Sequence, residues 1–357
     1  MQVDWNVATW EEVLKQIEPT EDDNARIEAA VASLRNVLTN NWTHATAVQE
    51  IVIGGSYAKN TLLRGHLEVD VVVFLAGEWT REDCLHSFRQ SIGQMWKLGQ
   101  DNVRLTRHSV QFTHPSTRVD VDLLFTFAIS ADSGLRVFDD RRQFQTQWTG
   151  KRKRSRHLND FDLLRETSTS VVQDQVRLVR QAQPRVRSLI QLAKALKVRF
   201  MDAAATYLPS YVLEILALDY VSQTCTVDFD QGLQHIFEQL RDLDTEFVFH
   251  RCSEAARMGI SSSAVEGYWR GRREWSQGAV LPDPVNPLHN TATLLKTSEL
   301  REVCTVLLDE VWGDQLMRSN SSEMAPASPV DFEEVVCPRA EIDRVGLIAS
   351  TAKHHQT

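Results

Sequence analysis

Residues 54–61 read Gly-Gly-Ser-Tyr-Ala-Lys-Asn-Thr, and residues 67–75 follow as Leu-Glu-Val-Asp-Val-Val-Val-Phe-Leu. The second stretch is typical of a buried β-strand, because it is apolar apart from two acids. Side chains alternate along a strand, so Glu68 and Asp70 point to the same face. Two carboxylates on one face of an apolar strand repel each other and are costly to bury. A bound divalent cation removes that cost, and oxygen ligands suit Mg²⁺ or Mn²⁺.

A second acidic pair lies on another β-like run about 50 residues later, where Asp120-Val121-Asp122 repeats the pattern. Either of these aspartates completes a three-carboxylate site for two divalent ions. Such ions lower the pKa of an attacking ribose hydroxyl and stabilise a leaving pyrophosphate. The Gly-Gly-Ser turn lets backbone N–H groups approach phosphate oxygens, and Ser56 adds a hydroxyl donor. No Gly-Lys-Ser/Thr follows, so the turn is not a Walker A loop.

Hydrophobic periodicity predicts an α+β protein with two lobes. Strands are expected at 48–53, 67–75, 103–113 and 118–127, and helices at 20–40 and 81–98. Beyond about residue 160 helical spacing dominates, with helices expected from Pro184 and at 210–221, 232–242 and 298–312. We expect a mixed α/β N-lobe with a central twisted sheet at 1–160, a helical C-lobe at 161–316 and a flexible tail at 317–357.

Composition and charge narrow the class of protein. The chain has 357 residues, 42% of them hydrophobic, and a net charge of −9. Residues 151–199 nevertheless hold 13 Lys or Arg against 4 Asp or Glu, a basic stripe that suggests a polyanionic partner. No apolar run approaches the length of a membrane span, and the acidic N-terminus lacks the apolar region of a secretory signal. The five cysteines form no CxxC pair, which favours a reducing compartment over a disulfide framework.

The motif Gly-Gly-Ser-x-x-Lys-x-Thr-x-Leu-x-Gly-x-x-Glu-x-Asp-Val-Val-Val-Phe-Leu resembles the core of the oligoadenylate synthases and the cGAS-like receptors, two related groups of nucleotidyltransferases. Three further stretches extend the resemblance across about residues 20–300. Residues 187–194, Arg-Ser-Leu-Ile-Gln-Leu-Ala-Lys, resemble the helix that bears a nucleotide-binding lysine. Residues 208–214, Leu-Pro-Ser-Tyr-Val-Leu-Glu, resemble the helix start whose tyrosine stacks on a base. Residues 281–287, Leu-Pro-Asp-Pro-Val-Asn-Pro, resemble the C-terminal Asp-Pro segment.

The resemblance implies a two-lobed nucleotidyltransferase fold and a role for each matching residue. It makes Glu68, Asp70 and Asp122 the catalytic metal ligands for two Mg²⁺ or Mn²⁺ ions, and it prefers Asp122 to Asp120. The nucleotide contacts that it implies are Gly55, Ser56, Lys194, Ser210 and Tyr211, with Lys194 reaching a phosphate and Tyr211 stacking on a base.

Two products are open for ATP and/or GTP as substrates. A cyclic dinucleotide such as cyclic GMP-AMP is favoured by Glu68-x-Asp70, since the oligoadenylate synthases typically show Asp-x-Asp. The Ser210-Tyr211 pair favours it too, because the synthases carry Gln-Tyr. Lys59 and the Asp283-Pro284 segment favour the alternative, a linear 2′-5′-oligoadenylate. A poly(A)-type RNA polymerase and a catalytically inactive RNA-binding module are further alternatives, which the C-lobe motifs and the intact acids respectively disfavour.

The expected activator is double-stranded RNA in the cytoplasm, in innate antiviral defence. The DNA-sensing vertebrate enzyme of this family carries a zinc-binding insertion, whereas His250 and Cys252 are the only close pair here. A structural zinc site needs four ligands, so we expect no zinc. Double-stranded RNA is recognised by shape and phosphates. The candidate RNA contacts are Lys151, Arg152, Lys153, Arg154, Arg156, Arg177, Arg180 and Arg185.

Overall fold

The computed structural model describes residues 3–5, 9–76, 81–106, 108–127, 169, 171–224, 226–243, 281–285, 289, 291–292 and 295–320. Residues 1–313 form one compact unit and residues 314–357 form a second. The first unit contains both a β-sheet and a helical core, which confirms the predicted α+β class.

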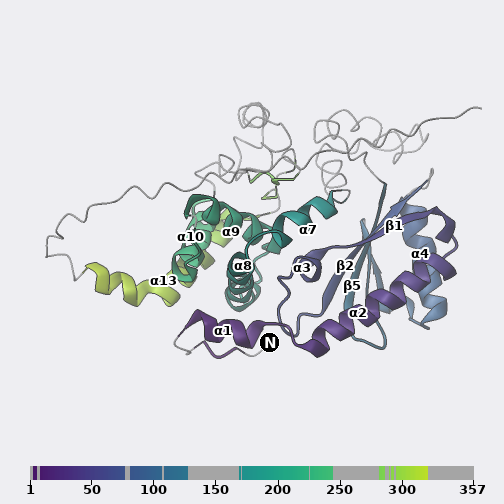
Figure 1. The fold of residues 1–357 in the computed structure, drawn as a ribbon, viewed down its shortest axis with the longest axis horizontal. Helices are drawn as coiled ribbons and strands as arrows, with labels where there is room; N and C mark the ends of the chain where they lie inside the picture. The colour runs from purple at the N-terminus through teal and green to yellow at the C-terminus, as the bar shows by residue number, and fades with distance from the viewer. Residues whose placement is uncertain are drawn as a thin grey trace, which may run out of the picture. The chain divides into compact units, whose positions relative to one another are not determined.

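A five-stranded mixed sheet has the order β1-β2-β5-β4-β3 (Figure 1). Its strands are β1 (Val48–Ile53), β2 (Glu68–Leu75), β3 (Val103–Leu105), β4 (Ser109–Thr113) and β5 (Asp120–Phe127). The pair β2·β5 is parallel, and the other three pairs are antiparallel. Parallel neighbours cannot be joined by a tight turn. The chain between β2 and β5 therefore forms helix α4 (Arg81–Met95) and the two strands β3 and β4.

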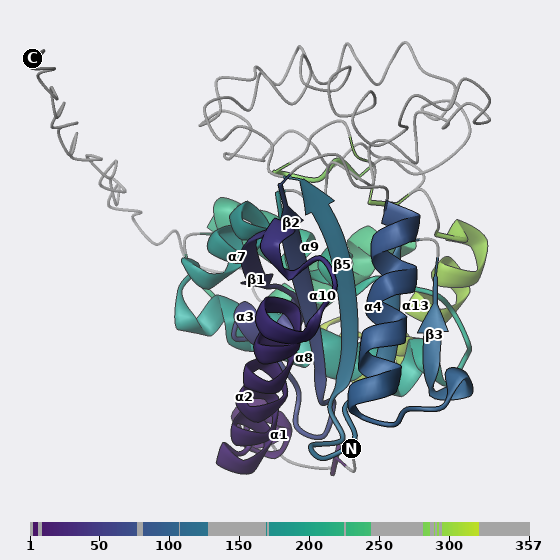
Figure 2. The same cartoon turned by 90° about the vertical axis from the view of Figure 1, so that its right-hand side faces the viewer.

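One face of the sheet is buried and apolar. Alternate residues of β2, such as Val71 and Val73, pack with Leu34 of α2 (Glu21–Asn36) and Phe88 of α4. Figure 2 shows these two helices lying against the same side of the sheet. The capping box formed by Thr20 and Asp23 starts α2 at the predicted position. On the opposite face, Val72 and Phe74 of β2 pack against Val172 of α7 (Val172–Arg180).

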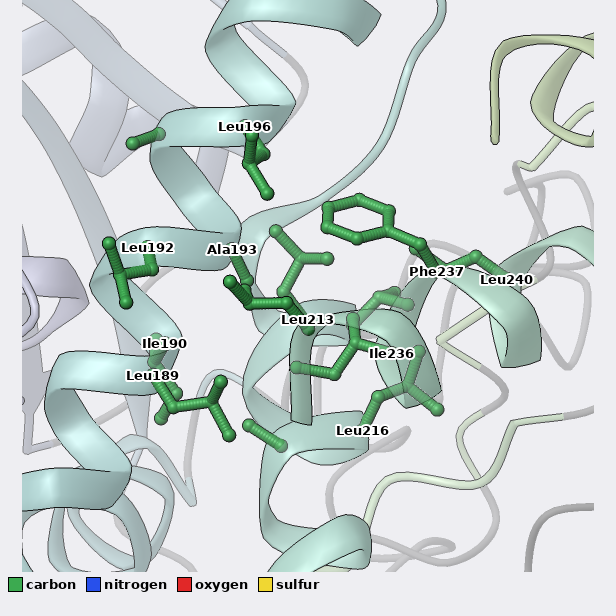
Figure 3. Close-up of a cluster of buried hydrophobic side chains, with 14 of the residues drawn as sticks. Leu189, Ile190, Leu192, Ala193, Leu196, Leu213, Leu216, Ile236, Phe237 and Leu240 are labelled. Carbon is green, nitrogen blue, oxygen red and sulfur yellow. The ribbon is translucent and has the colours of Figure 1, made fainter. Parts of the chain in front are cut away.

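The second core is helical. It joins α1 (Trp10–Ile17), α8 (Pro184–Lys197), α9 (Ser210–Thr224), α10 (Phe229–Arg241) and the first part of α13 (Thr297–Asn320). Figure 3 shows its centre, where Leu189, Leu213, Ile236 and their neighbours interlock between α8, α9 and α10. Pro184 occupies the first turn of α8, as predicted. Helices α1 and α7 lie outside the sequence-based predictions, and α1 packs against α8 although the two are far apart in the chain.

The single strand predicted at 103–113 is wrong, because the chain turns in its middle. The hydroxyl of Thr106 accepts hydrogen bonds from the backbone N–H groups of His108, at 3.1 Å, and Ser109, at 2.8 Å. The turn separates β3 from β4, which pair as an antiparallel hairpin. A threonine hydroxyl that satisfies nearby backbone donors is a common way to stabilise a turn. In the part of the chain that the structure describes, no helix is both long and apolar enough to cross a membrane.

Candidate active site

The parallel register of β2 and β5 places the predicted metal ligands side by side. Asp70 pairs with Asp122, and Glu68 pairs with Asp120. Paired residues of neighbouring strands point to the same face and lie about 5 Å apart. The structure thus brings Glu68, Asp70 and Asp122 together on the face that α2 and α4 leave open, although 44 residues separate β2 from β5.

Burial and mutual repulsion both disfavour the charged forms of these acids. Burial, followed by the charges of Glu68 and Asp122, raises the pKa of Asp70 to about 7. Burial, then Asp122 and Asp120, also raises the pKa of Glu68. One oxygen of Asp122 accepts a hydrogen bond from Gln111 Nε2 at 3.1 Å. Its other oxygen, Oδ1, is buried and has no partner among the described residues.

These residues fit a hard divalent cation by their chemistry. Carboxylate oxygens are the ligands that Mg²⁺ and Mn²⁺ prefer, and a cation would favour the charged form of all three acids. The buried, unpartnered Oδ1 of Asp122 is the kind of atom that a metal satisfies. Across the described residues, no group of three or more His, Cys, Asp or Glu side chains is arranged to hold a metal ion. Binding would therefore require the side chains of Glu68, Asp70 and Asp122 to turn toward a common point.

The Gly-Gly-Ser turn lies directly against Asp70. The backbone N–H of Gly54 donates to the carbonyl of Asp70 at 2.8 Å. Gly55 has φ = +65°, a conformation that other L-residues seldom adopt, and opens the short helix α3 (Gly55–Ala58). A Cβ atom at this position would overlap the carboxylate of Asp70, coming within 2.9 Å of its Cγ. Glycine is therefore needed here both for the backbone and for the space beside Asp70.

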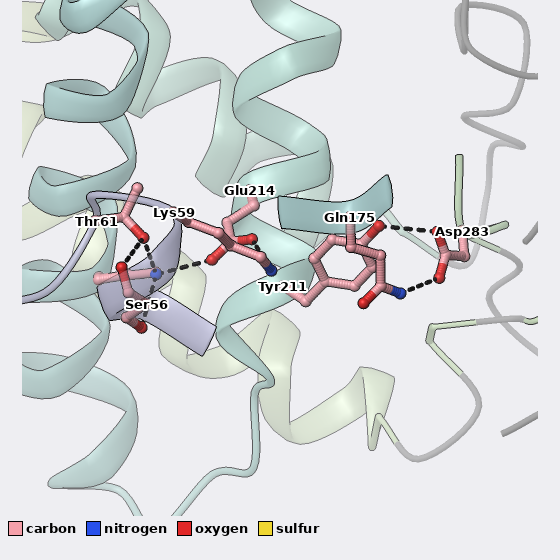
Figure 4. A network of polar contacts seen from close by, with 8 residues as sticks. Ser56, Lys59, Thr61, Gln175, Tyr211, Glu214 and Asp283 are labelled. Atoms are coloured by element: carbon pink, nitrogen blue, oxygen red, sulfur yellow. Dashed lines mark hydrogen bonds and ion pairs between the residues drawn. The ribbon is translucent and has the colours of Figure 1, made fainter. Parts of the chain in front are cut away.

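Lys194 lies behind the turn in a buried ionic cluster. It is only 3% exposed, and its ammonium group donates to Ser56 Oγ at 3.2 Å, Thr61 Oγ1 at 2.8 Å and Glu214 Oε1 at 2.8 Å. Figure 4 labels these three partners. Lys59 donates to the other oxygen of Glu214 at 2.7 Å. Two ammonium groups thus share one carboxylate, which leaves an excess positive charge beneath Ser56. The structure places Lys194 near Ser56, and its contact with a phosphate stays a prediction.

Sequence reasoning missed Glu214 and Lys59 as parts of the site. The signal for Glu214 was its position, since it is the only charged residue in the run Val212–Leu218. A lone acid in a buried apolar helix requires a partner. Burial alone would raise the pKa of Glu214, but Lys194 and Lys59 outweigh that effect and hold it below its usual value. Burial lowers the pKa of Lys194, and Glu214 opposes part of that decrease.

Tyr211 is held in a second network beside the first. Its hydroxyl donates to Asp283 Oδ1 at 2.8 Å, and Lys59 Nζ lies 4.5 Å from the centre of its ring (Figure 4). Asp283 is fully buried and also accepts from Gln175 Nε2 at 2.7 Å and from the backbone N–H of Val285 at 2.8 Å. The ring is therefore fixed in orientation. Ser210 begins α9 beside it and is partly buried.

The predicted RNA contacts divide into two sets. Lys151, Arg152, Lys153, Arg154 and Arg156 lie outside the described residues. Three others, Arg177, Arg180 and Arg185, lie on or beside helices α7 and α8. All three are exposed; Arg177 pairs with Asp174, and Arg185 pairs with Glu11 at 3.7 Å. The Nε of Arg185 donates to the carbonyl of Val227 at 2.7 Å, and its guanidinium lies 4.4 Å from the ring centre of Phe229. The Arg185 side chain therefore already has partners within the protein.

A cavity of about 330 Å³ opens over the same face of the sheet. The acids Glu68, Asp120 and Asp122 line one part of it. The rest is lined by residues of η3 (Gln100–Asn102), β3 and β4 that sequence reasoning did not single out, among them Asp101, Asn102, Arg104 and Gln111. The open acidic face therefore adjoins a space large enough for a small molecule.

Residues 5–143 match the sequence model of the Second Messenger Oligonucleotide or Dinucleotide Synthetase domain. This region contains the Gly-Gly-Ser turn and all three acids. The narrower resemblance to cGAS-like receptors and oligoadenylate synthases stays a prediction. No curated protein matches the chain.

Solved structures show the same fold over most of the chain. CdnC of E. coli MS115-1, solved with ATP, has 17% identity and a TM-score of 0.57, covering 87% of this chain and 90% of its own. The CD-NTase CdnG of Bradyrhizobium diazoefficiens, in complex with GTP, has 12% identity and a TM-score of 0.53, covering 87% and 91%. The Cid1 poly(U) polymerase, solved with Mg and 3′-dATP, has 13% identity and a TM-score of 0.51, covering 89% and 94%. The chain therefore has a nucleotidyltransferase fold.

Replacing Glu214 with Gln is expected to destabilise the protein by about 3–5 kcal/mol, because it leaves two buried ammonium groups without a counter-charge. The matched control is Glu310→Gln, which removes a half-exposed partner of Arg199 and should cost about 0–1 kcal/mol. Urea unfolding measures both variants.

At acid pH, wild type and Glu214→Gln should differ less in their free energy of unfolding. The pKa of Glu214 lies below its usual value in the folded protein, so its stabilisation is complete above that usual value and is lost as pH falls through the lowered pKa. If Glu214→Gln and Glu310→Gln lost the same free energy of unfolding at neutral pH, the buried cluster would not stabilise the fold.

Proposed function

We propose that this chain is a divalent-cation-dependent nucleotidyltransferase that joins ATP and/or GTP into a cyclic dinucleotide messenger, such as cyclic GMP-AMP. The observation that carries the proposal is the alignment of Glu68, Asp70 and Asp122 on neighbouring parallel strands beneath a Gly-Gly-Ser turn. The same residues lie in the region that matches the second-messenger synthetase domain. The relatives solved with ATP and with GTP support these nucleotides as substrates.

The acids would hold two Mg²⁺ or Mn²⁺ ions. When bound, such ions supply charge neutralisation for the leaving pyrophosphate and acidify the attacking hydroxyl. The chain itself contributes position. Gly55 leaves room for the carboxylate of Asp70 against the turn, and the Ser56 hydroxyl of the same turn accepts a hydrogen bond from Lys194. The excess positive charge of the Lys59–Glu214–Lys194 cluster favours a triphosphate at this position.

Ring closure requires the linear intermediate to bind a second time in a new orientation. Stacking on an aromatic face tolerates different bases and contributes about 1–3 kcal/mol per base. Tyr211, with its hydroxyl fixed on Asp283, offers such a face in a constant orientation. The alternative of a linear 2′-5′-oligoadenylate uses the same acids and differs in how the intermediate is held.

Asp70→Asn is expected to abolish nucleotide transfer without unfolding the protein, because it removes one negative ligand from the proposed metal site. Asp120→Asn is the matched control. It changes an acid on the same face whose carboxylate accepts from Thr113 Oγ1 at 2.6 Å, and it should retain most activity. Labelled ATP and GTP, together and separately, measure the rates. Near-normal turnover of Asp70→Asn at saturating Mg²⁺ or Mn²⁺ would show that Asp70 is not an essential metal ligand.

The product of the wild-type reaction separates the alternatives. After phosphatase treatment and mass spectrometry, a cyclic dinucleotide survives unchanged because it has no terminal phosphate. A ladder of phosphatase-sensitive adenylate oligomers would replace the proposal with the oligoadenylate alternative. Extension of an added RNA primer would instead favour a terminal transferase, in line with the RNA terminal uridylyl transferase activity ascribed to Cid1.

Gly55→Ala is expected to weaken Mn²⁺ binding by about tenfold or more, because the added methyl displaces the carboxylate of Asp70. Gly65→Ala is the matched control. Gly65 also has a positive φ, +73°, but nothing lies within 4 Å of a Cβ atom placed there. Both variants bear about 1–2 kcal/mol of backbone strain, so the difference between them isolates the contact with Asp70. Titration calorimetry of metal binding by the folded proteins measures it; equal affinities would contradict the assigned role of the turn.

We further propose that double-stranded RNA activates the enzyme through the basic residues of 151–199. Reversing the charges of Lys151, Arg152, Lys153 and Arg154 should weaken RNA binding and flatten its dependence on salt, because fewer counterions are released. The measurement is binding at several salt concentrations, together with stimulation of transfer. If the variant bound RNA with the affinity and the salt dependence of wild type, these four residues would not be RNA contacts. A protein partner would then be sought, since CdnC has been solved in a complex with HORMA-deltaN.

A further inference from the structure

Four strands of the sheet carry one continuous row of polar side chains. Asp70 pairs with Asp122 across β2 and β5, Asp122 pairs with Gln111 across β5 and β4, and Gln111 pairs with Arg104 across β4 and β3. Directly paired residues project from the same face of a sheet. Arg104 therefore shares the open face with the proposed metal ligands. Two strand spacings, about 10 Å, separate its backbone from that of Asp122.

The cavity of about 330 Å³ lies over this row. Its lining includes Glu68 and Asp122 at the acidic part and Asp101, Asn102 and Arg104 on the β3 side. Arg104 is exposed, and among the described residues its guanidinium has no hydrogen bond or ion pair. A guanidinium with five donors and no acceptor thus lines a space that begins at the reacting centre.

The charge of the cavity decides which part of a nucleotide fits there. Four carboxylates, those of Glu68, Asp101, Asp120 and Asp122, line it together with the single guanidinium of Arg104. A triphosphate placed on the β3 side would be repelled by Asp101 and would gain only one positive partner. A neutral base with hydrogen-bonding edges has no such penalty. The β3 side of the cavity is therefore suited to a base, and the opposite side to the hydroxyl that reacts.

The donors and acceptors at this position distinguish among the bases. Arg104 only donates, and it matches the O6 and N7 acceptors of guanine. The carboxylate of Asp101 only accepts, and it matches the N1–H and 2-amino donors of the same base. Adenine instead presents its 6-amino group where guanine has O6, so two donors would face each other. A buried donor that meets another donor loses its hydrogen bond and disfavours binding.

We propose that this cavity binds the base of the nucleotide whose hydroxyl attacks, and that Arg104 selects guanine for that position. The inference rests on the proposed nucleotidyl transfer and names the residue that sets its acceptor specificity. Arg104 contacts O6 and N7, and Asp101 contacts the Watson–Crick edge. The attacking hydroxyl then lies toward Asp122, and the other nucleotide keeps its triphosphate beside the Gly-Gly-Ser turn.

Acceptors without a triphosphate isolate this step. With ATP as the only donor, the rate of joining is compared for GMP, 7-deaza-GMP, IMP and AMP, with products identified by mass spectrometry. Wild type should prefer GMP to AMP. Arg104→Gln should reduce that preference by about 5- to 150-fold, since a bidentate contact contributes that much discrimination and Gln pairs well with adenine. Arg35→Gln, on the helix α2 that covers the opposite face, is the matched control and should leave the ratio unchanged.

The modified bases test which atoms of guanine contact Arg104 and Asp101. Loss of N7 in 7-deaza-GMP should slow wild type but add no further penalty in Arg104→Met, because methionine has no donor for N7. Loss of the 2-amino group in IMP should slow both proteins equally and should slow Asp101→Asn less. An unchanged ratio of GMP to AMP in Arg104→Gln, with an unchanged melting temperature, would overturn the proposal.

Binding without turnover keeps the two proposals separate. Equilibrium dialysis compares GMP with AMP for wild type and Arg104→Gln, whether or not transfer is observed. If wild type transfers no nucleotide but binds GMP more tightly, and Arg104→Gln loses that preference, the guanine site stands while the proposed activity fails. If transfer occurs but neither assay shows a preference that depends on Arg104, the activity stands and the guanine site fails.

Discussion

Carboxylates that repel one another lie side by side because β2 and β5 pair in parallel. The same strands bury Val71, Val73 and Leu123 against α2 and α4 on their other face, and that apolar contact fixes the register. A slip of one residue would turn the apolar side chains to solvent and the acids into the core. The hydrophobic face thus holds Asp70 beside Asp122 against their repulsion. Burial, followed by the charges of Glu68 and Asp122, raises the pKa of Asp70 to about 7 in this arrangement.

The positive part of the site comes from a different region of the chain. Lys59 follows the Gly-Gly-Ser turn, whereas Lys194 and Glu214 lie on α8 and α9, and all three side chains are buried together. Glu214 neutralises one of the two ammonium groups, so the cluster keeps a positive charge close to Ser56. The acidic face and this cluster flank the same turn. A triphosphate with bound divalent ions is complementary to both, since it offers anionic oxygens to one side and cations to the other.

The elements with a strong local signal were predictable from the sequence, and the contacts between distant elements were not. Strand β2 and its two acids followed from alternation, and α2 followed from its cap and its apolar spacing. The hairpin of β3 and β4 was missed because its turn contains neither glycine nor proline. Arg104 was missed for a related reason: its place beside Gln111 depends on that hairpin. The role of Glu214 was hidden because its two partners lie 155 and 20 residues away in the chain.

Chemistry and base selection would share one rigid element in this protein. The row from Asp70 to Arg104 crosses four hydrogen-bonded strands, so the distance between the acids and the guanidinium is set by the spacing of the sheet. Side chains on strands hold their geometry more precisely than side chains on loops. A nucleotide read at Arg104 would therefore present its hydroxyl to Asp122 at a defined place, without a separate conformational step. The Gly-Gly-Ser turn and the buried lysines would position the other nucleotide from the opposite side. Tyr211 would then stack on the base that Arg104 does not contact.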